Sequence, residues 1–262
     1  TSYSDTEVAP WTTYYYRARA LNTNGNSAYS NIASAMTKLG IYPIPGMIAW
    51  WRAEGNGLDS VGTNDIPTPF GASYVTGEVG QAFARPGFGN RLVTPGSPDF
   101  VLTNAFTVEG WIFASQPTNG IIATSGTAVP RFDAWTIAMT NVPGSVSFII
   151  NSDSTTDTVE ILAPVQINQW QHFAATFDAT NGLSLYINGV LAAHTNTTIR
   201  PFGVLATNQS PFVSLGNSGV VSNYSTFIGA LDEITVYSRA LTPTEIQNIY
   251  QVGGNGKLAI TH

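Results

Sequence analysis

Acidic side chains are the first candidates for chemistry in this sequence. Two carboxylates about 5–5.5 Å apart can cleave a glycosidic bond with retention of configuration, and on a strand such a pair needs residues i and i+2, which share a face. Asp153, Asp157 and Glu160 are instead separated by four and three positions. Asp232 and Glu233 are adjacent and would point to opposite faces of a strand. We therefore expect no carboxylate pair for glycoside hydrolysis.

The sequence also shows no arrangement of a nucleophile with a base that would form a catalytic site. Cysteine is absent, which removes thiolate nucleophiles, thiolate metal sites and disulfides. The sequence has three histidines, His172, His194 and His262, and no Gly-x-Ser-x-Gly, His-Glu-x-x-His or phosphate-loop motif. His172 lies in an apolar segment, where a packing or hydrogen-bonding role is expected. The sequence therefore predicts a protein that is not an enzyme.

Aromatic and polar residues in predicted loops are candidates for holding a ligand. A sugar is bound by an aromatic ring against its C–H groups, with hydrogen bonds to its hydroxyls, in a shallow apolar site. The segment Arg131-Phe132-Asp133-Ala134-Trp135 combines a guanidinium, a carboxylate and two aromatic rings. Tyr224 adds a ring from a Gly/Asn/Ser-rich connection. Trp135 also begins an alternating segment, so it is either a ligand-binding residue or a core residue.

The composition limits the class of protein. Of 262 residues, 10 are Lys or Arg and 16 are Asp or Glu, giving a net charge of -6, while 43% are hydrophobic. Few basic residues argue against binding to nucleic acid or to anionic lipid. No apolar run reaches the roughly 18 residues of a membrane-inserted helix. A cysteine-free chain rich in Thr, Asn and Gly is typical of bacterial extracellular proteins, so we expect a secreted or cell-surface protein.

Alternating apolar residues predict a chain built from short strands. Val146, Phe148 and Ile150 would share one face of a strand, because side chains on a strand repeat every two residues. The step Asn188-Gly189 between two such segments predicts a hairpin with a type I′ turn. Trp170, which opens another apolar segment, is predicted to be a core residue.

One helix is predicted near the C-terminal end. Thr242-Pro243-Thr244-Glu245 is a capping box with proline at the first helical position. Ile246, Ile249 and Tyr250 follow at helical spacing, and Gly253-Gly254 is a stop signal. The predicted helix is short and closes a chain made of strands.

The first 38 residues form a separate pattern. Tyr14, Tyr16 and Ala18 alternate, and after a polar turn a second strand is predicted from Ala28 to Met36. This segment, 1–38, resembles the last two strands of a fibronectin type III domain, with Tyr14 as the tyrosine-corner residue. The resemblance implies a partial domain, because two strands bury little core. Residues 39–45, with prolines at 43 and 45, are predicted to be a linker.

Three further segments carry a second resemblance. They are Ala49–Gly62, Trp170–Asp178 continuing to Asn188-Gly189, and Phe227–Leu241. In this order they resemble a laminin-G-like, concanavalin A-type jelly roll that covers residues 46–253 and leaves 254–262 as a tail. The resemblance implies an all-β fold, an antiparallel jelly-roll β-sandwich with one short C-terminal helix. It also implies binding of carbohydrate or of protein partners.

A structural calcium site is implied by the same resemblance. Asp59 and Asp232 lie in matching segments, and Asn64 with main-chain oxygens could complete the six to eight ligands that calcium prefers. The alternative is that Asp59 caps a turn and that Asp232 hydrogen-bonds within the sheet. Leu231 and Ile234 are apolar and three positions apart. This spacing predicts a bulge at Asp232-Glu233 that would re-aim a carboxylate.

These observations favour a non-catalytic extracellular binding module of a modular protein. Its expected partner is a glycan or an extracellular protein, and its expected role is carbohydrate binding or cell adhesion. The alternative is a structural or assembly subunit that self-associates, or contacts neighbouring domains, through its N-terminal strands, whose edges are open to pairing. A glycoside hydrolase is the third possibility considered.

Overall fold

A computed structural model of the chain describes residues 13–23, 25–36, 44–67, 73–85, 92–117, 119–126, 133–141, 144–152, 157–203, 210–217 and 226–253, with the backbone alone at positions 36 and 85. The candidate ligand residues Arg131, Phe132 and Tyr224 lie outside these ranges, as does the predicted tail, 254–262. The chain divides into two compact units, Thr1–Tyr42 and Pro43–His262. This division falls within the predicted linker, 39–45.

The first unit consists of two short antiparallel strand pairs. The pairs are β1 (Thr13–Tyr16) with β4 (Ala33–Met36), and β2 (Leu21–Asn22) with β3 (Gly25–Asn26). Between them, the guanidinium of Arg17 lies 3.9 Å from the ring centroid of Tyr29. Tyr15 is 72% exposed and Ile32 is 67% exposed. The unit is thus a narrow ribbon with apolar side chains in solvent, and its likeness to a fibronectin type III domain stays a prediction.

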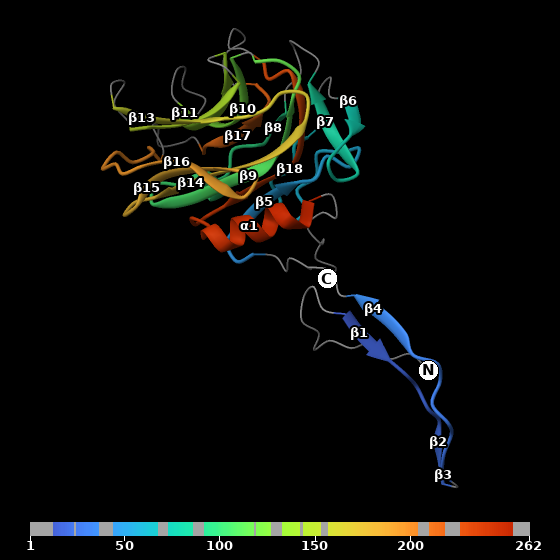
Figure 1. Cartoon of the computed structure of the whole chain (residues 1–262). Coiled ribbons are helices and arrows are strands. Elements are labelled where there is room, and N and C mark those ends of the chain that lie inside the picture. The colour runs from blue at the N-terminus through green and yellow to red at the C-terminus, as the bar shows by residue number, and fades with distance from the viewer. Residues whose placement is uncertain are drawn as a thin grey trace. The chain divides into compact units, whose positions relative to one another are not determined.

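The second unit is a sandwich of two antiparallel sheets (Figure 1). The smaller sheet has six strands, in the spatial order β13 (Thr158–Pro164), β12 (Ser145–Asn151), β11 (Asp133–Thr140), β10 (Gly120–Gly126), β17 (Phe212–Leu215) and β8 (Leu92–Val93). The larger sheet has eight, in the order β16 (Val190–Thr195), β15 (Gly182–Ile187), β14 (Trp170–Asp178), β9 (Ala105–Ala114), β18 (Gly229–Tyr237), β7 (Gln81–Arg85) and β6 (Ser73–Thr76), with β5 (Met47–Trp51) also paired to β18. A short 3-10 helix, η1 (Pro98–Phe100), and one α-helix, α1 (Pro243–Val252), complete the described elements.

The hydrophobic core lies between the two sheets. Phe106 of β9 is at its centre, with ring centroids 5.6 Å from Trp135, 5.9 Å from Phe148 and 5.9 Å from Phe177. These rings come from both sheets and are fully buried, and each buried aromatic ring stabilises the fold by roughly 1.5–3 kcal/mol. The predicted all-β antiparallel sandwich with one short helix is therefore confirmed.

The local signals of hairpin and helix are confirmed as well. Asn188 and Gly189 have φ angles of 50° and 77°, the left-handed values that a type I′ turn requires, and they join β15 to β16. At the start of α1, the Thr242 hydroxyl accepts from the N–H of Glu245, and the Glu245 carboxylate accepts from the N–H of Thr242. The guanidinium of Arg239 binds the same carboxylate and lowers the pKa of Glu245 to about 2.

A buried polar network lies on the outer face of the larger sheet, beneath α1. The Glu109 carboxylate is 3.1 Å from Nε2 of His172 and accepts a hydrogen bond of 3.0 Å from the hydroxyl of Tyr237. All three side chains are fully buried. From α1, the ring of Tyr250 covers His172 with ring centroids 6.3 Å apart. His172 therefore has the hydrogen-bonding role that its apolar segment predicts, and burial raises the pKa of Tyr237 well above its ordinary value.

Candidate functional site

Of the candidate ligand segment 131–135, the structure describes Asp133, Ala134 and Trp135. Trp135 is fully buried and packs on Phe106, so it is a core residue rather than a ligand-binding residue. The physical reason is alternation, because Trp135, Ile137 and Met139 share the inner face of β11. Asp133, at the start of β11, is half-buried. Burial raises its pKa to about 6, against the opposing effect of a hydrogen bond with Thr124.

Two of the three candidate calcium ligands lie together but form a turn. Asp59 Oδ1 accepts from the N–H groups of Trp50 and Val61, and Asp59 Oδ2 accepts from the N–H of Asn64. The amide of Asn64 donates to the carbonyl of Ile48. These donors occupy three of the roughly four lone-pair directions of the Asp59 carboxylate. The contacts are those of the turn-capping alternative, and none of them joins Asp59 or Asn64 to Asp232.

Asp232 lies at the predicted bulge, which is confirmed. The register between β18 and β9 shifts between Asp232 and Thr235, and Glu233 has a φ of 55°. Asp232 is fully buried; its Oδ2 accepts from the N–H of Val79, and its Oδ1 has no hydrogen-bond partner among the described residues. Burial, with the nearby charges of Glu233 and Glu54, raises the pKa of Asp232 to about 8. Of the three candidate ligands, Asp232 is the one for which a nearby cation would offset both the cost of burying the charged carboxylate and the repulsion from neighbouring carboxylates.

The turn beside Asp232 is shaped around carboxylates. A side chain at Gly77 would place its Cβ only 2.5 Å from Oδ2 of Asp232, so glycine is needed for the close approach. Glu54 reaches the same turn and accepts from the N–H of Gln81. Calcium takes backbone as well as carboxylate oxygens, and the carboxylates of Asp232 and Glu54 both accept hydrogen bonds from this turn. Within the described ranges, no group of three or more His, Asp or Glu is arranged as a metal site.

A pocket opens on the outer face of the larger sheet, and none of the candidate ligand or calcium residues is among those that line it. Its volume is about 380 Å³, within the roughly 300–1,000 Å³ of small-molecule sites. Residues from five strands and from two adjoining segments form it: Val75, Thr76, Ala84, Phe113, Ser115, Trp170, Ile228, Gly229 and Ala230. None of these side chains is charged, and their side-chain hydrogen-bonding groups are the hydroxyls of Thr76 and Ser115 and the indole N–H of Trp170.

Strand register explains why the sheet is hollow at this point. One row of the sheet runs from Trp170 to Phe113, then to Ala230 and to Ala84, each residue paired with the next across a strand boundary. Two large rings therefore stand beside two methyl groups. Because strands lie about 4.8 Å apart, the two small residues leave an open strip roughly 10 Å wide.

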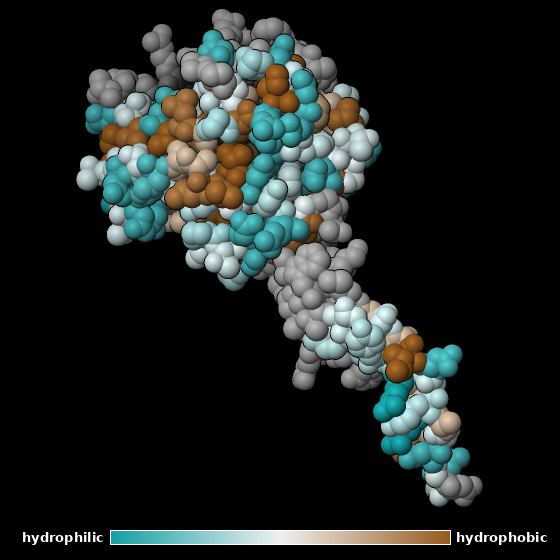
Figure 2. Space-filling view, in the orientation of Figure 1, coloured by the Kyte–Doolittle hydropathy of each residue, from teal (hydrophilic) through white to brown (hydrophobic). Residues whose placement is uncertain are grey.

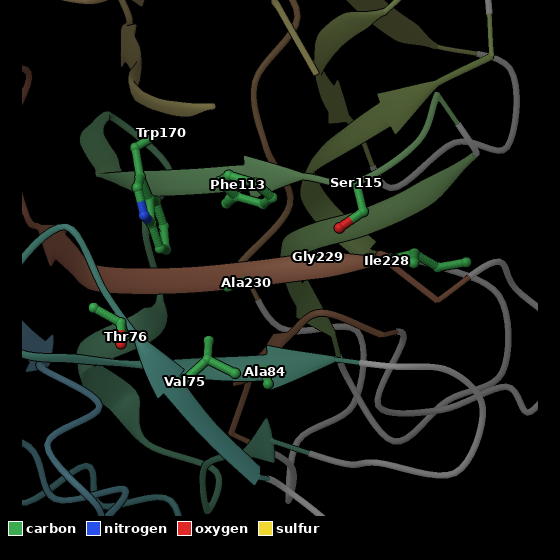
Figure 3. Close-up of a pocket in the computed structure, with 9 residues that line it drawn as sticks. All are labelled: Val75, Thr76, Ala84, Phe113, Ser115, Trp170, Ile228, Gly229 and Ala230. Atoms are coloured by element: carbon green, nitrogen blue, oxygen red, sulfur yellow. The ribbon is translucent and has the colours of Figure 1, made fainter. Parts of the chain in front are cut away.

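The aromatic wall of the pocket is partly open to solvent. Figure 3 shows Trp170 and Phe113 on one side of β18, with Val75, Thr76 and Ala84 on the other. The two rings lie edge to face, with centroids 5.7 Å apart and planes at 62°. Trp170 is half-buried, so its prediction as a core residue is wrong. The sequence does indicate this position. Phe173, Ala175 and Phe177 face the core, and Trp170 lies an odd number of positions from each of them, so its side chain faces outward.

The surface beyond the pocket is mixed in character. Figure 2 shows apolar patches between polar ones on the larger unit. Among its exposed apolar residues, Val190 and Leu191 of β16 are 64% and 52% exposed. The described part of the chain contains no helix long and apolar enough to cross a membrane.

Two facing antiparallel sheets, with a short helix on the outer face of one of them, define a jelly-roll domain of the lectin type. A sequence profile of the concanavalin A-like lectin/glucanases superfamily, of the laminin G kind, matches residues 87–247. The chain therefore belongs to this superfamily. No curated protein matches the sequence.

Solved structures share the fold at low sequence identity. Domain 4 of AbnA, a GH43 extracellular arabinanase from Geobacillus stearothermophilus solved with arabinotriose, is 22% identical with a TM-score of 0.59, over 77% of this chain and 97% of that domain. The binding domain of Paraclostridial Mosquitocidal Protein 1 is 17% identical with a TM-score of 0.61, over 78% of this chain and 52% of that one. The Trypanosoma rangeli sialidase is 17% identical with a TM-score of 0.56, over 80% and 33%.

Proposed function

We propose that this jelly roll is a non-catalytic carbohydrate-binding module of a secreted or cell-surface protein, and that its ligand occupies the outer-face pocket. The observation that carries the proposal is the partly exposed pair Trp170 and Phe113 beside two hydroxyl groups in an uncharged hollow. An aromatic face packs against the C–H groups of a sugar, and hydroxyls fix its orientation. The arabinotriose complex of the arabinanase domain and the toxin binding domain support a binding role for this fold.

The experiment is a glycan array with the whole chain, followed by titration calorimetry of the saccharides that bind. Trp170→Ala should weaken binding at least tenfold, because aromatic residues at the centre of a site carry a large share of its binding energy. Leu191→Ala is the matched control, since it removes an exposed apolar side chain on β16. Equal loss in both variants, or binding unchanged by Trp170→Ala, would refute this site.

The non-catalytic part of the proposal has its own test. The chain is incubated with the polysaccharides that bind it, and new reducing ends are measured. We expect no release above a buffer blank. Release that depends on the chain would establish a glycoside hydrolase, and Asp133, whose pKa is raised to about 6 by burial, would be the first acid to substitute.

Calcium is proposed at Asp232, with Glu54 and main-chain oxygens of the adjoining turn. The proposal is supported by the buried Oδ1 atom of Asp232, which has no partner among the described residues, and by the neighbouring carboxylates. A calcium ion there would fix the turn between β6 and β7, and these two strands form one wall of the pocket. Its role is structural.

Assembly through the N-terminal ribbon is a second candidate function. A two-stranded sheet is marginally stable by itself, and Tyr15, Leu21 and Ile32 are each more than 60% exposed. Covering these side chains with another chain would bury apolar surface and pair the open strand edges. Sedimentation of the whole chain over a range of concentrations tests this role, with Ile32→Ser as the variant expected to remove any self-association.

A further inference from the structure

The pocket has two unlike walls, and the second wall restricts what the pocket can hold. Opposite the rings of Trp170 and Phe113, Val75 contributes its two methyl groups and Ala84 contributes one (Figure 3). Ala230 adds another methyl group to the floor, where it is paired with Ala84 in the register of β18 and β7. This side of the pocket therefore offers methyl groups and no side-chain hydrogen bond.

The two side-chain hydroxyl groups of the pocket lie at its two ends. Thr76 and Ser115 are exposed, and Figure 3 places their side chains at opposite ends of the hollow. A sugar that spans the pocket therefore meets a hydroxyl at either end but only methyl groups along one side. A ligand hydroxyl held against that side would lose its water without gaining a partner, which is unfavourable. A ligand methyl group there would instead bury apolar surface.

The absence of charged side chains from the lining of the pocket restricts the class of ligand further. No acidic or basic side chain is among the residues that line the pocket. A sugar carboxylate or ammonium group would be desolvated there without an opposite charge, and burying an unpaired charge is strongly unfavourable. The pocket therefore suits a neutral ligand.

We propose that the pocket selects a neutral pyranose that carries a methyl group, as an acetamido sugar or a 6-deoxy sugar does, with that methyl group against Val75, Ala84 and Ala230. This inference rests on the proposed function and specifies its ligand class. Val75 is then a specificity-determining residue, and Trp170 with Phe113 binds the ring irrespective of the substituent. Because hydrophobic pockets reject an added hydroxyl by about 100-fold at most, we expect a preference of about 10- to 100-fold.

The test uses matched sugar pairs that differ at the substituent. N-acetylglucosamine is compared with glucose, and L-fucose with L-galactose, by titration calorimetry of the whole chain. At least one methyl-bearing sugar should bind about tenfold or more tightly than its partner. Glucuronic acid should bind no better than glucose.

The variant Val75→Thr, which is nearly equal in shape, tests whether the wall formed by Val75 causes the preference for methyl-bearing sugars. Val75→Thr replaces one methyl group by a hydroxyl on a strand position that favours threonine, and it should reduce the preference within the affected pair by about fivefold or more. Val190→Thr, at an exposed position on β16, should leave the preference unchanged.

The outcomes distinguish the methyl-selective pocket from the carbohydrate-binding function. Binding of both members of each pair with equal affinity overturns the methyl-selective pocket and leaves the carbohydrate-binding function in place. A preference that survives Val75→Thr, or that is lost equally in Val190→Thr, overturns the assignment of the methyl wall. Binding of glycans that Trp170→Ala does not weaken would overturn this inference and the placement of the ligand in this pocket, and it would leave a carbohydrate-binding role at another site. No binding of any sugar overturns the proposed function and this inference together.

Discussion

The buried carboxylate of Glu109 should be a principal determinant of the stability of the jelly roll. Its two oxygens serve two other fully buried groups, Nε2 of His172 at 3.1 Å and the hydroxyl of Tyr237 at 3.0 Å. Glu109→Ala removes both contacts at once and leaves His172 and Tyr237 without this partner beneath α1. The residue also sits in β9, which pairs with β14 and β18 at the centre of the larger sheet.

The size of the effect follows from burial. Glu109→Ala leaves two buried polar groups, on His172 and Tyr237, without this partner, and leaving such a group unsatisfied costs about 1–3 kcal/mol each, or about 2–6 kcal/mol together. For a domain of 150–250 residues, each kcal/mol shifts the melting temperature by about 2–4 °C. We therefore expect Glu109→Ala to lower the melting temperature by about 4–24 °C. Glu160→Ala, at an exposed position on β13, should change stability by no more than about 0.5 kcal/mol.

The assay is urea unfolding followed by tryptophan fluorescence, with Tyr237→Phe and the double variant completing a cycle. Contacting residues in one network show coupling energies of roughly 0.5–3 kcal/mol, so the two losses should not add. If the free energies of unfolding of Glu109→Ala and Glu160→Ala differ by less than about 1 kcal/mol, Glu109 is not a principal determinant of stability. Additive losses in the double variant would show that Tyr237 does not depend on this carboxylate.

Three further predictions concern acids and caps. Burial raises the pKa of Asp133 to about 6, so its contribution to stability is present at low pH and is lost as the pH rises from about 4 through about 6; the melting temperature of wild type relative to Asp133→Asn should fall over that range, and parallel pH curves would contradict this. Thr242→Ala should destabilise the fold by about 1 kcal/mol in urea unfolding, because it removes the N-cap of α1, whereas Thr244→Ala in the same turn should not. Calcium should raise the melting temperature of wild type and of Asp59→Asn but not of Asp232→Asn, and an equal melting temperature of wild type in calcium and in chelator would remove the ion from the site.

Local sequence signals predicted the fold because each acts over a few residues. The turn at Asn188-Gly189, the cap at Thr242 and the bulge at Asp232 depend on backbone preferences and spacing that the sequence shows directly. The pocket has no such signal. Its row of Trp170, Phe113, Ala230 and Ala84 depends on how four strands from distant parts of the chain align, and one shifted register would change every pair.

The core position of Trp135 was left open at the sequence level for a related reason. A guanidinium, a carboxylate and two rings within 131–135 suggest a site by their chemical types alone. Which of them faces a ligand depends on strand parity, and parity places Trp135 in the core. Parity also places Trp170 on the outer face. Ala175 lies two positions from Phe173 and shares its inner face, whereas Trp170 lies an odd number of positions from Phe173 and must face the other way.

The position of β18 has a consequence for biosynthesis. This strand pairs with β9 on one edge and with β7 and β5 on the other, yet every other described strand precedes it in the chain. During synthesis, the other strands of the larger sheet therefore leave the ribosome before β18, the strand that joins them, has been made. Until then the halves expose unpaired edges, and long-range pairing of this kind is slow and prone to aggregation. A chain truncated before Gly229 should accumulate as aggregate rather than as a smaller folded domain.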